Sequence, residues 1–241
     1  IKCFKKRGEI IVPSFTWVSS ANAIINTGCK PVFVDIDLNS RNIDPSRLEK
    51  NISKRTIAIM VVHFSGLPCD MDPILKVSKK YNLTIIEDSA ETLGAKYKGS
   101  FTGTFGLGCF SFFPSKNITT TEGGMLTLKK KSMYEEAKKL IAHGIKKERK
   151  YFWHRESSLA GHNYRLPNHL AALGASQLKK LKGFNNERNK IAKIYNQDLK
   201  KYSDLISVPK IPKNCTHSYQ MYTIRVKQKF RNNFIFFLKS K

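Results

Sequence analysis

One stretch of the sequence, residues 83–128, places a carboxylate and an amine where the two could act together. An apolar run ends there in Glu87 and Asp88, and Lys116 stands alone among small and hydroxyl residues after a short aromatic run. An unprotonated lysine amine can form a covalent bond with a carbonyl carbon, and a carboxylate can keep a heteroaromatic nitrogen protonated. We therefore take Asp88 and Lys116 as the candidate catalytic residues of a site that binds a cofactor.

Simpler interpretations stand beside these residues. Asp88 is followed by Ser-Ala and could cap a helix, and an isolated lysine such as Lys116 is usually a surface charge. Ser111 could donate a hydrogen bond to a phosphate group or merely face solvent. Trp17 could stack on a planar ring, although an aromatic residue in a first helical turn more often belongs to the core. The glycine-containing segments match neither GxGxxG nor a Walker motif, which argues against a nucleotide cofactor.

The elements that position these residues alternate between strands and helices. Short apolar, β-branched runs predict strands, and longer stretches with Ser14, Asp44 or Asp70 at the N-terminal cap predict helices. The predicted strands are 10–12, 30–37, 56–64, 83–88, 109–113, 124–128 and 219–226. The predicted helices are 16–26, 45–48, 71–81, 132–143, 167–181 and 184–199.

This alternation predicts an α/β fold with a mostly parallel central sheet flanked by helices. Such sheets bind ligands at the carboxyl ends of their strands. The character of the sequence changes near Phe184, so we expect a large domain over residues 1–183 and an incomplete smaller C-terminal α/β domain over residues 184–241. The chain lacks an initiating Met and a signal peptide, and we expect it to be an internal fragment.

Charge and cysteine content narrow the partners. The chain has 43 Lys+Arg against 18 Asp+Glu, a net charge of +25, but the excess is mostly Lys on predicted helices without interleaved Arg and aromatic residues. This pattern favours solvated helix faces over a nucleic-acid surface. The longest apolar run, residues 57–62, is too short to span a membrane. Five cysteines without a CxxC pair predict a reducing cytoplasm, no disulfide framework and no metal site.

Six blocks of the sequence together point to a known family. They are VPSFTWVSSANAI (12–24), GCKPVFVDID (28–37), VVHFSGLPCDMDPI (61–74), IIEDSAETLGAKYKG (85–99), FSFFPSKNITTTEGGM (110–125) and GHNYRLPNHLAALGASQL (161–178). In content, order and spacing they resemble the DegT/DnrJ family of sugar aminotransferases. That family depends on pyridoxal 5′-phosphate (PLP) and has the aspartate-aminotransferase-like fold, fold type I.

The resemblance implies a role for each matching residue. Lys116 falls where the family forms a Schiff base with PLP, and Asp88 falls where the family pairs with the pyridine nitrogen. Ser111 matches a hydroxyl that binds the phosphate, and Trp17 lies in the block whose aromatic residue stacks near the cofactor. Asn163 matches an Asn that reaches the phosphate of the partner subunit, which implies a homodimer with shared active sites.

The resemblance also indicates a substrate. Glu91 occupies the position over the cofactor ring that often holds Gln or His, Arg165 falls close to the interface, and a YFWH segment ends at His154. These features are similar to the perosamine-synthase branch, which moves an amino group to C4 of a nucleotide-linked 4-keto-6-deoxyhexose such as GDP-4-keto-6-deoxymannose. We expect L-glutamate as the donor and surface polysaccharides, such as O-antigen, as the destination. The family's phosphate-binding Gly-Thr/Ser segment would lie upstream of Gly8.

Three other functions remain open at this point. A dehydratase on the same scaffold would carry His in place of Lys116, so the lysine argues against it. A regulatory or sensing protein of the family would bind PLP without turnover. A basic nucleic-acid-binding module would show salt-dependent binding to DNA.

Overall fold

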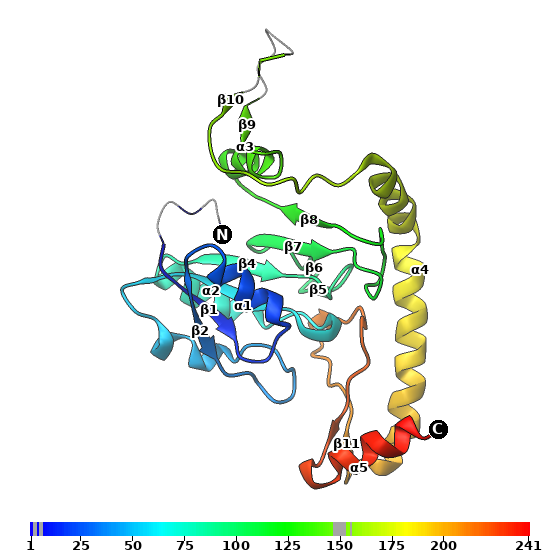
Figure 1. The fold of residues 1–241 in the computed structure, drawn as a ribbon. Coiled ribbons are helices and arrows are strands. Elements are labelled where there is room, and N and C mark those ends of the chain that lie inside the picture. Colours follow the sequence, from blue (N-terminus) through cyan, green and yellow to red (C-terminus); the bar gives the residue numbers. More distant parts are fainter. Residues whose placement is uncertain (2–3, 5–6, 147–152, 155) are drawn as a thin grey trace.

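A six-stranded sheet forms the middle of the molecule (Figure 1). The computed structural model describes residues 1, 4, 7–146, 153–154 and 156–241. The strand order is β2-β1-β3-β4-β7-β8, and every neighbouring pair is parallel except β7 and β8. This arrangement confirms the predicted mostly parallel α/β sheet. The strands are β1 (Glu9–Pro13), β2 (Lys30–Val34), β3 (Thr56–Val62), β4 (Thr84–Asp88), β7 (Leu107–Ser111) and β8 (Gly124–Thr127).

Both faces of the sheet are buried, which explains the near-continuous apolar strands. Because side chains alternate along a strand, Ile10 and Ile86 pack on one face and Ile11 on the other. Helix α1 (Val18–Ile25) covers the first face with Ile24, and helix α2 (Met71–Lys80) covers the second with Ile74. Two apolar clusters therefore hold the sheet between its helices.

The order of the strands determines where a ligand would bind. The chain moves outward from β1 through α1 to β2, and in the opposite direction from β3 through α2 to β4. The switch in direction falls between β1 and β3, and open α/β sheets bind ligands outside the carboxyl ends of the strands at such a point. The loops that follow β1, β3, β4 and β7 all leave the sheet at this edge. Trp17, Glu91 and Lys116 lie in these loops, and Asp88 and Ser111 end the strands that lead into them.

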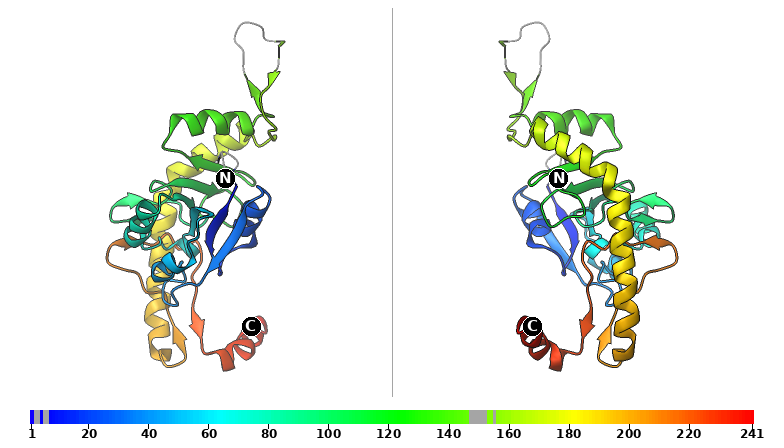
Figure 2. Two further views of the ribbon diagram at one scale, coloured as in Figure 1. Left: turned by 90° about the vertical axis from the view of Figure 1, so that its left-hand side faces the viewer. Right: turned by 90° about the vertical axis from the view of Figure 1, so that its right-hand side faces the viewer.

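One long helix, α4 (Asn168–Leu199), runs along the side of the sheet (Figures 1 and 2). The prediction of two helices, 167–181 and 184–199, is wrong, because Gly183 lies inside α4 with open space beside its Cα. A glycine within a helix costs only about 1 kcal/mol relative to alanine, which the long flanking turns tolerate. The proposed domain division at 183 falls within this helix and stays a prediction.

The remaining elements lie at the two ends of the molecule and beside the sheet (Figure 2). Helix α3 and the hairpin β9–β10 project at one end, and α5 lies at the other. Their bounds are α3 (Lys131–Leu140), β9 (Ile145–Lys146), β10 (Glu156–Ser157), β5 (Lys96–Tyr97), β6 (Ser100–Phe101), β11 (Ile206–Ser207), β12 (Cys215–Thr216), β13 (Arg225–Val226) and α5 (Gln228–Lys239). The 3₁₀ turns of the described residues are η1 (Pro45–Arg47), η2 (Glu49–Asn51), η3 (Phe64–Gly66) and η4 (Lys200–Tyr202).

The predicted caps have different outcomes. Asp44 accepts a hydrogen bond from the Ser46 amide at the start of η1, as expected. Asp70 precedes α2 but accepts from the Tyr97 hydroxyl at 2.7 Å, so its predicted capping bond is wrong. Ser14 does not cap α1 either, because that helix begins only at Val18. The chain bends over residues 14–16 between β1 and the helix.

The predicted strand 219–226 is mostly wrong. Only Arg225–Val226 forms a strand, which pairs with β11, while residues 217–221 fold back against the loops at the carboxyl edge of the sheet. Cys29, Cys69, Cys109 and Cys215 are free thiols. No helix of the described residues is long and apolar enough to cross a membrane.

Candidate active site

Asp88 ends β4 on the α1 side of the sheet. Its Oδ2 accepts a hydrogen bond from Ser20 Oγ at 2.7 Å, and Ser20 is in turn 2.9 Å from Thr16 Oγ1. Its Oδ1 accepts a weaker bond from the Ala90 amide at 3.2 Å. Residues 89–95 form turns, so the alternative role as a helix cap is wrong. An ionised carboxylate has about four acceptor positions, so this half-buried group can accept a further donor.

Its neighbour Glu87 points to the opposite face and is completely buried. Its two oxygens accept hydrogen bonds from His63 Nε2 at 3.1 Å and from the Gly103 and Gly106 amides at 2.7 and 2.6 Å. Burial raises the pKa of Glu87, but the bonds from His63 and the two amides outweigh it and hold the pKa below its usual value. The adjacent acids therefore differ: Glu87 is enclosed by protein donors, and Asp88 stays accessible.

Lys116 lies in a turn just beyond β7, where its amide donates to the Phe113 carbonyl at 3.0 Å. Its Nζ is 3.6 Å from Glu91 Oε1, and the two side chains are only 16% and 18% exposed. The other Glu91 oxygen accepts from the Ser65 amide at 2.6 Å. The alternative of a free surface lysine is therefore wrong. Ser65 makes this contact from a left-handed backbone conformation, φ 61°, which is uncommon outside glycine.

Ser111 and Trp17 border the same edge of the sheet. Ser111 is the last residue of β7 and is half-buried, and its hydroxyl accepts a long bond from the Phe113 amide at 3.3 Å. The hydroxyl proton remains available to another acceptor. Trp17 precedes α1 and is 77% exposed, so the alternative that it belongs to the core is wrong. The structure leaves its ring free to meet a ligand or another subunit.

Asn163 lies apart from these contacts. It forms an isolated β-bridge with Ala142, beyond α3, and its Oδ1 accepts from Arg165 Nε at 3.4 Å. Both of these side chains are exposed. Of the YFWH segment, Tyr151 and Phe152 lie outside the described residues.

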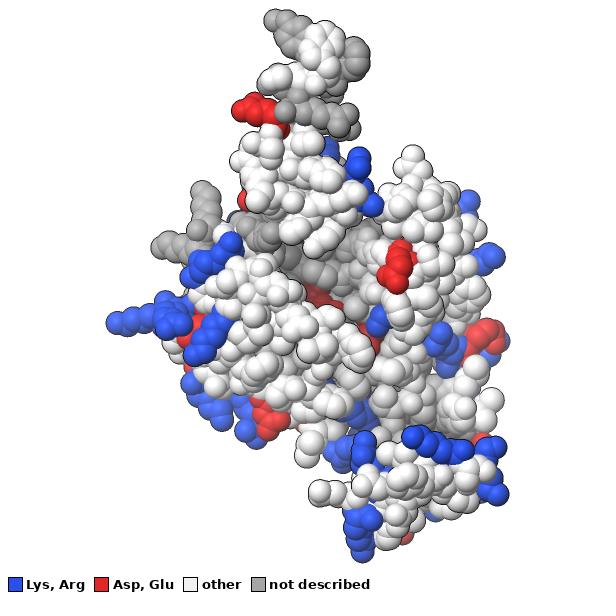
Figure 3. Space-filling model, viewed as in Figure 1, with Lys and Arg blue, Asp and Glu red and all other residues white. Residues whose placement is uncertain are grey.

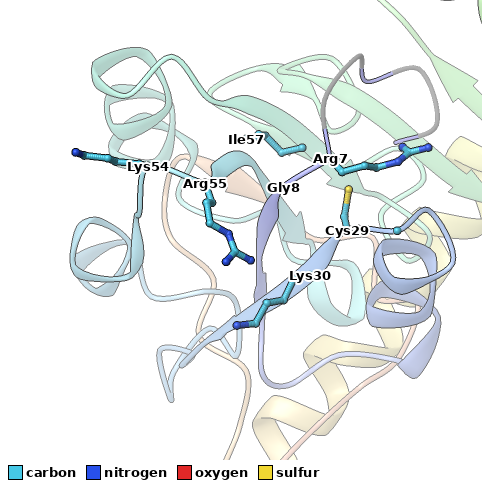
Figure 4. A pocket seen from close by; sticks show the side chains of 8 residues that line it. Arg7, Gly8, Cys29, Lys30, Lys54, Arg55 and Ile57 are labelled. Atoms are coloured by element: carbon cyan, nitrogen blue, oxygen red, sulfur yellow. The ribbon is translucent and has the colours of Figure 1, made fainter.

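A basic hollow of about 440 Å³ lies at the other edge of the sheet (Figure 4). Gly8 precedes β1, Lys30 begins β2 and Ile57 lies near the start of β3, so the hollow faces the amino ends of the strands. It is therefore separate from the loops that contain Asp88 and Lys116. Its lining residues are Arg7, Gly8, Gly28, Cys29, Lys30, Lys54, Arg55 and Ile57.

The charged side chains on the face shown in Figure 3 are not spread evenly. In the face shown in Figure 3, Lys and Arg side chains gather at the left edge and the lower end, while acidic side chains lie in a hollow in the middle. The large positive net charge is thus not concentrated around that hollow. The expectation that the excess lysines mainly form solvated helix faces stays a prediction.

With this geometry established, comparison with known proteins identifies the family. The DegT/DnrJ/EryC1/StrS aminotransferase family matches the chain over residues 2–241. The chain belongs to this family. The resemblance inferred from the six sequence blocks is confirmed, and so is the type I fold.

Relatives of this DegT/DnrJ family member include two GDP-perosamine synthases. The protein from Escherichia coli O157:H7 is 42% identical over 217 residues, which cover 90% of this chain and 58% of that protein. The protein from Caulobacter vibrioides is 39% identical over 219 residues, with 90% and 58% covered. The chain therefore spans less than two thirds of the length of these relatives.

Solved structures agree with the sequence comparison. Helicobacter pylori PseC, an aminotransferase of pseudoaminic acid biosynthesis, superposes with a TM-score of 0.91 at 33% identity, covering 98% of this chain and 63% of that one. The putative sugar aminotransferase Spr1654 of Streptococcus pneumoniae, solved in a PLP form, superposes with a TM-score of 0.88 at 28% identity, covering 97% and 64%. The PLP of that structure is bound to Spr1654.

Several site residues of this DegT/DnrJ family member escaped sequence analysis. Ser20 lies four residues after Thr16, so the predicted helix alone would have placed both hydroxyls on one face. The Ser65 amide lies in the short turn η3 and the Gln220 side chain in an irregular segment, and neither contact follows a periodic sequence pattern. His63 ends an apolar run of the sequence, and a polar residue buried there requires a hydrogen-bond partner, which is Glu87.

Proposed function

We propose that this chain is the PLP-binding part of an aminotransferase, with Lys116 as the residue that bonds covalently to the cofactor. The observation that supports this most is the pairing of Lys116 with Glu91 in a semi-enclosed turn. Asp88 stands at the same sheet edge, at the end of the neighbouring strand. Few surface lysines combine such enclosure with a carboxylate partner and a nearby ligand edge.

The residues present fit PLP. Asp88 is held by Ser20 yet keeps acceptor capacity, which suits the N–H of a protonated pyridine ring. The Ser111 hydroxyl can donate to a phosphate oxygen from the end of β7. The exposed indole of Trp17 can lie against the planar ring. When bound, PLP supplies an electron sink that stabilises negative charge at the carbon next to the transferred nitrogen.

The side chains of the protein would then have separate roles in the reaction. Lys116, with its amine free, would be the base that removes a proton from the donor's α-carbon and the acid that delivers that proton to the former aldehyde carbon of the cofactor. Glu91 orients the lysine while the Ser65 amide fixes the second carboxylate oxygen. Asp88 keeps the ring nitrogen protonated, and Ser20 prevents that carboxylate from rotating away.

The substrates follow from the relatives. The GDP-perosamine synthases, at 42% and 39% identity, support a nucleotide-linked 4-keto-6-deoxyhexose as the amine acceptor, with L-glutamate as the donor. We extend this to the synthesis of a deoxyamino sugar for surface polysaccharide in the cytoplasm. We further propose a homodimer, in which the exposed Asn163 and Arg165 contribute to the site of the partner.

The test is a screen of 4-keto and 3-keto nucleotide sugars with glutamate and PLP. It uses the full-length protein, its Lys116→Ala variant and Lys179→Ala, which removes an exposed lysine of α4, as control. We expect amine transfer by the wild type and the control and none by Lys116→Ala. Deoxygenated product would indicate a dehydratase, and PLP binding without turnover a regulatory protein. Transfer by Lys116→Ala would contradict the assignment.

A further inference from the structure

Residues 217–221 form a buried irregular segment that packs on the loops of the candidate site. Four successive side chains are almost enclosed: His217, Ser218, Tyr219 and Gln220 are 6%, 1%, 5% and 8% exposed. They lie about a hundred residues or more from the loops that they contact. A buried segment without regular structure must satisfy its backbone through specific partners, so those partners are informative.

The segment bonds to the loop after β3 and to the loop after β4. The Ser218 amide donates to the Gly66 carbonyl at 3.0 Å, and Ser65 Oγ donates to the Met221 carbonyl at 2.8 Å. Ser218 Oγ donates to the Glu91 carbonyl at 3.1 Å. Ser65 and Glu91, which are hydrogen-bonded to one another, are therefore both hydrogen-bonded to this segment.

The segment also brackets Lys116. On the preceding residue, the Ser115 carbonyl accepts a hydrogen bond from Gln220 Nε2 at 3.0 Å. On the following residue, Asn117 Nδ2 donates to the Ser218 carbonyl at 2.8 Å. Lys116 thus lies between two long-range bonds to a single segment. Ser115 is exposed, so its side chain is not held by packing. The hydrogen bond from Gln220 is therefore a specific restraint on the turn.

Helix α4 anchors the segment from its other side. Arg188 Nη1 donates to the Tyr219 and Gln220 carbonyls at 3.0 and 3.2 Å, and Asn189 Nδ2 donates to the His217 carbonyl at 3.0 Å. The position of Gln220 is therefore set by a long helix. Side chains held by rigid elements keep reacting groups in place, and a displacement of about 1 Å can cost a hundredfold in rate.

We propose that Gln220 is a positioning residue for Lys116: its Nε2–H holds the Ser115 carbonyl and so fixes the turn that presents the lysine to Glu91. The inference rests on the proposed role of Lys116. Gln220 touches neither Lys116 nor Glu91 by a hydrogen bond, so it acts through the backbone. Its Oε1 is buried and has no hydrogen-bond partner among the described residues, so the amide is kept here for its donor group.

The geometry suggests a clean substitution. Gln220→Met keeps the length and volume of the side chain, removes the bond to Ser115 and also removes the unpaired Oε1. The loss of one hydrogen bond destabilises the fold, and the removal of one unpaired buried acceptor stabilises it. The two effects largely cancel, so the free energy of unfolding should change little. Gln220→Asn is a second variant, which keeps an amide but is one methylene too short to reach Ser115. Gln197→Met, on the exposed surface of α4, is the matched control.

The experiment measures backbone hydrogen exchange in full-length protein without PLP, and steady-state kinetics with PLP. In both Gln220 variants we expect exchange over residues 114–118 to rise about tenfold, the factor for one lost hydrogen bond. We also expect kcat to fall about tenfold or more with KM unchanged in both variants. The denaturation midpoint should be kept in Gln220→Met, whereas Gln220→Asn leaves a buried amide donor unpaired and should lower it. Gln197→Met should match the wild type in all three.

Other results would overturn the proposal. Unchanged exchange over 114–118 would show that Gln220 does not restrain the turn. Exchange raised throughout the protein in Gln220→Met, with a lower denaturation midpoint, would show that Gln220 only supports packing. The exchange result does not depend on PLP chemistry, so it separates a failure of this inference from a failure of the proposed function.

Discussion

Replacing Glu87 by Gln should destabilise the fold while leaving the folded protein active. The carboxylate accepts three hydrogen bonds, from His63 Nε2 and from the Gly103 and Gly106 amides. A glutamine has one acceptor oxygen. If this oxygen receives the His63 and Gly103 donors, the new NH₂ group faces the Gly106 amide. The reverse orientation is worse, because His63 Nδ1 accepts from the Cys69 amide and its proton stays on Nε2.

The size of the effect follows from these contacts. One buried N–H left without an acceptor costs about 1–3 kcal/mol, and two hydrogen bonds that lose their charged acceptor weaken by about 1 kcal/mol each. The removal of a buried charge offsets part of this loss. We expect a net destabilisation of about 3 kcal/mol, which lowers Tm by about 6–12 °C in a chain of this size.

The effect should depend on pH in a defined direction. Because the folded protein holds the pKa of Glu87 below its ordinary value of 4.5, the carboxylate stabilises the fold at higher pH. This contribution decreases as the pH falls below 4.5 and is lost through the folded-state pKa. The stability difference between wild type and Glu87→Gln should therefore be largest near neutral pH and should narrow in acid.

The assay is chemical denaturation at several pH values, with activity measured on the folded fraction. Glu135→Gln on the exposed surface of α3 is the control, and it should stay within about 0.5 kcal/mol of the wild type. A Glu87→Gln variant of wild-type stability at pH 7 would refute the argument. So would a stability difference that widens in acid.

Three further substitutions test the site and its surroundings. Asp88→Asn should keep the fold, since an amide oxygen can still accept from Ser20, but should lower kcat by orders of magnitude; a near-normal rate would remove its electronic role. Gly66→Ala should cost about 3 kcal/mol, because a Cβ there meets the Tyr219 amide at 2.7 Å at φ 108°. Gly99→Ala, also at positive φ but with open space, should cost about 1 kcal/mol; equal denaturation midpoints would refute the contact argument.

The sequence predicted the sheet edge at which the candidate residues gather. Apolar runs that end in Asp88 and precede Lys116 are strand signals, and the carboxyl ends of parallel strands share one edge. Strand periodicity also requires Glu87 and Asp88 to face opposite sides. Which side holds Ser20 and which holds His63 depends on how α1 and α2 cross the sheet, and periodicity alone does not determine that.

The contacts that refine the site were not predictable in the same way. Gln220 and Ser218 reach the Lys116 turn from an irregular segment, and hydrogen bonds to backbone carbonyls impose no periodic pattern on either partner. The false helix break at Gly183 has a different cause. Glycine is the usual signal of a helix end, but its local preference of about 1 kcal/mol is too small to interrupt the 32-residue helix α4.

The most direct test of the account is to find which lysine bonds to PLP. The full-length protein is mixed with one equivalent of PLP, reduced with borohydride, digested and analysed by mass spectrometry, alongside a Lys116→Arg variant. The account predicts the cofactor mass on the peptide that contains Lys116 and none on the corresponding variant peptide. The same cofactor mass on another lysine in both proteins, or unchanged labelling in Lys116→Arg, would contradict it.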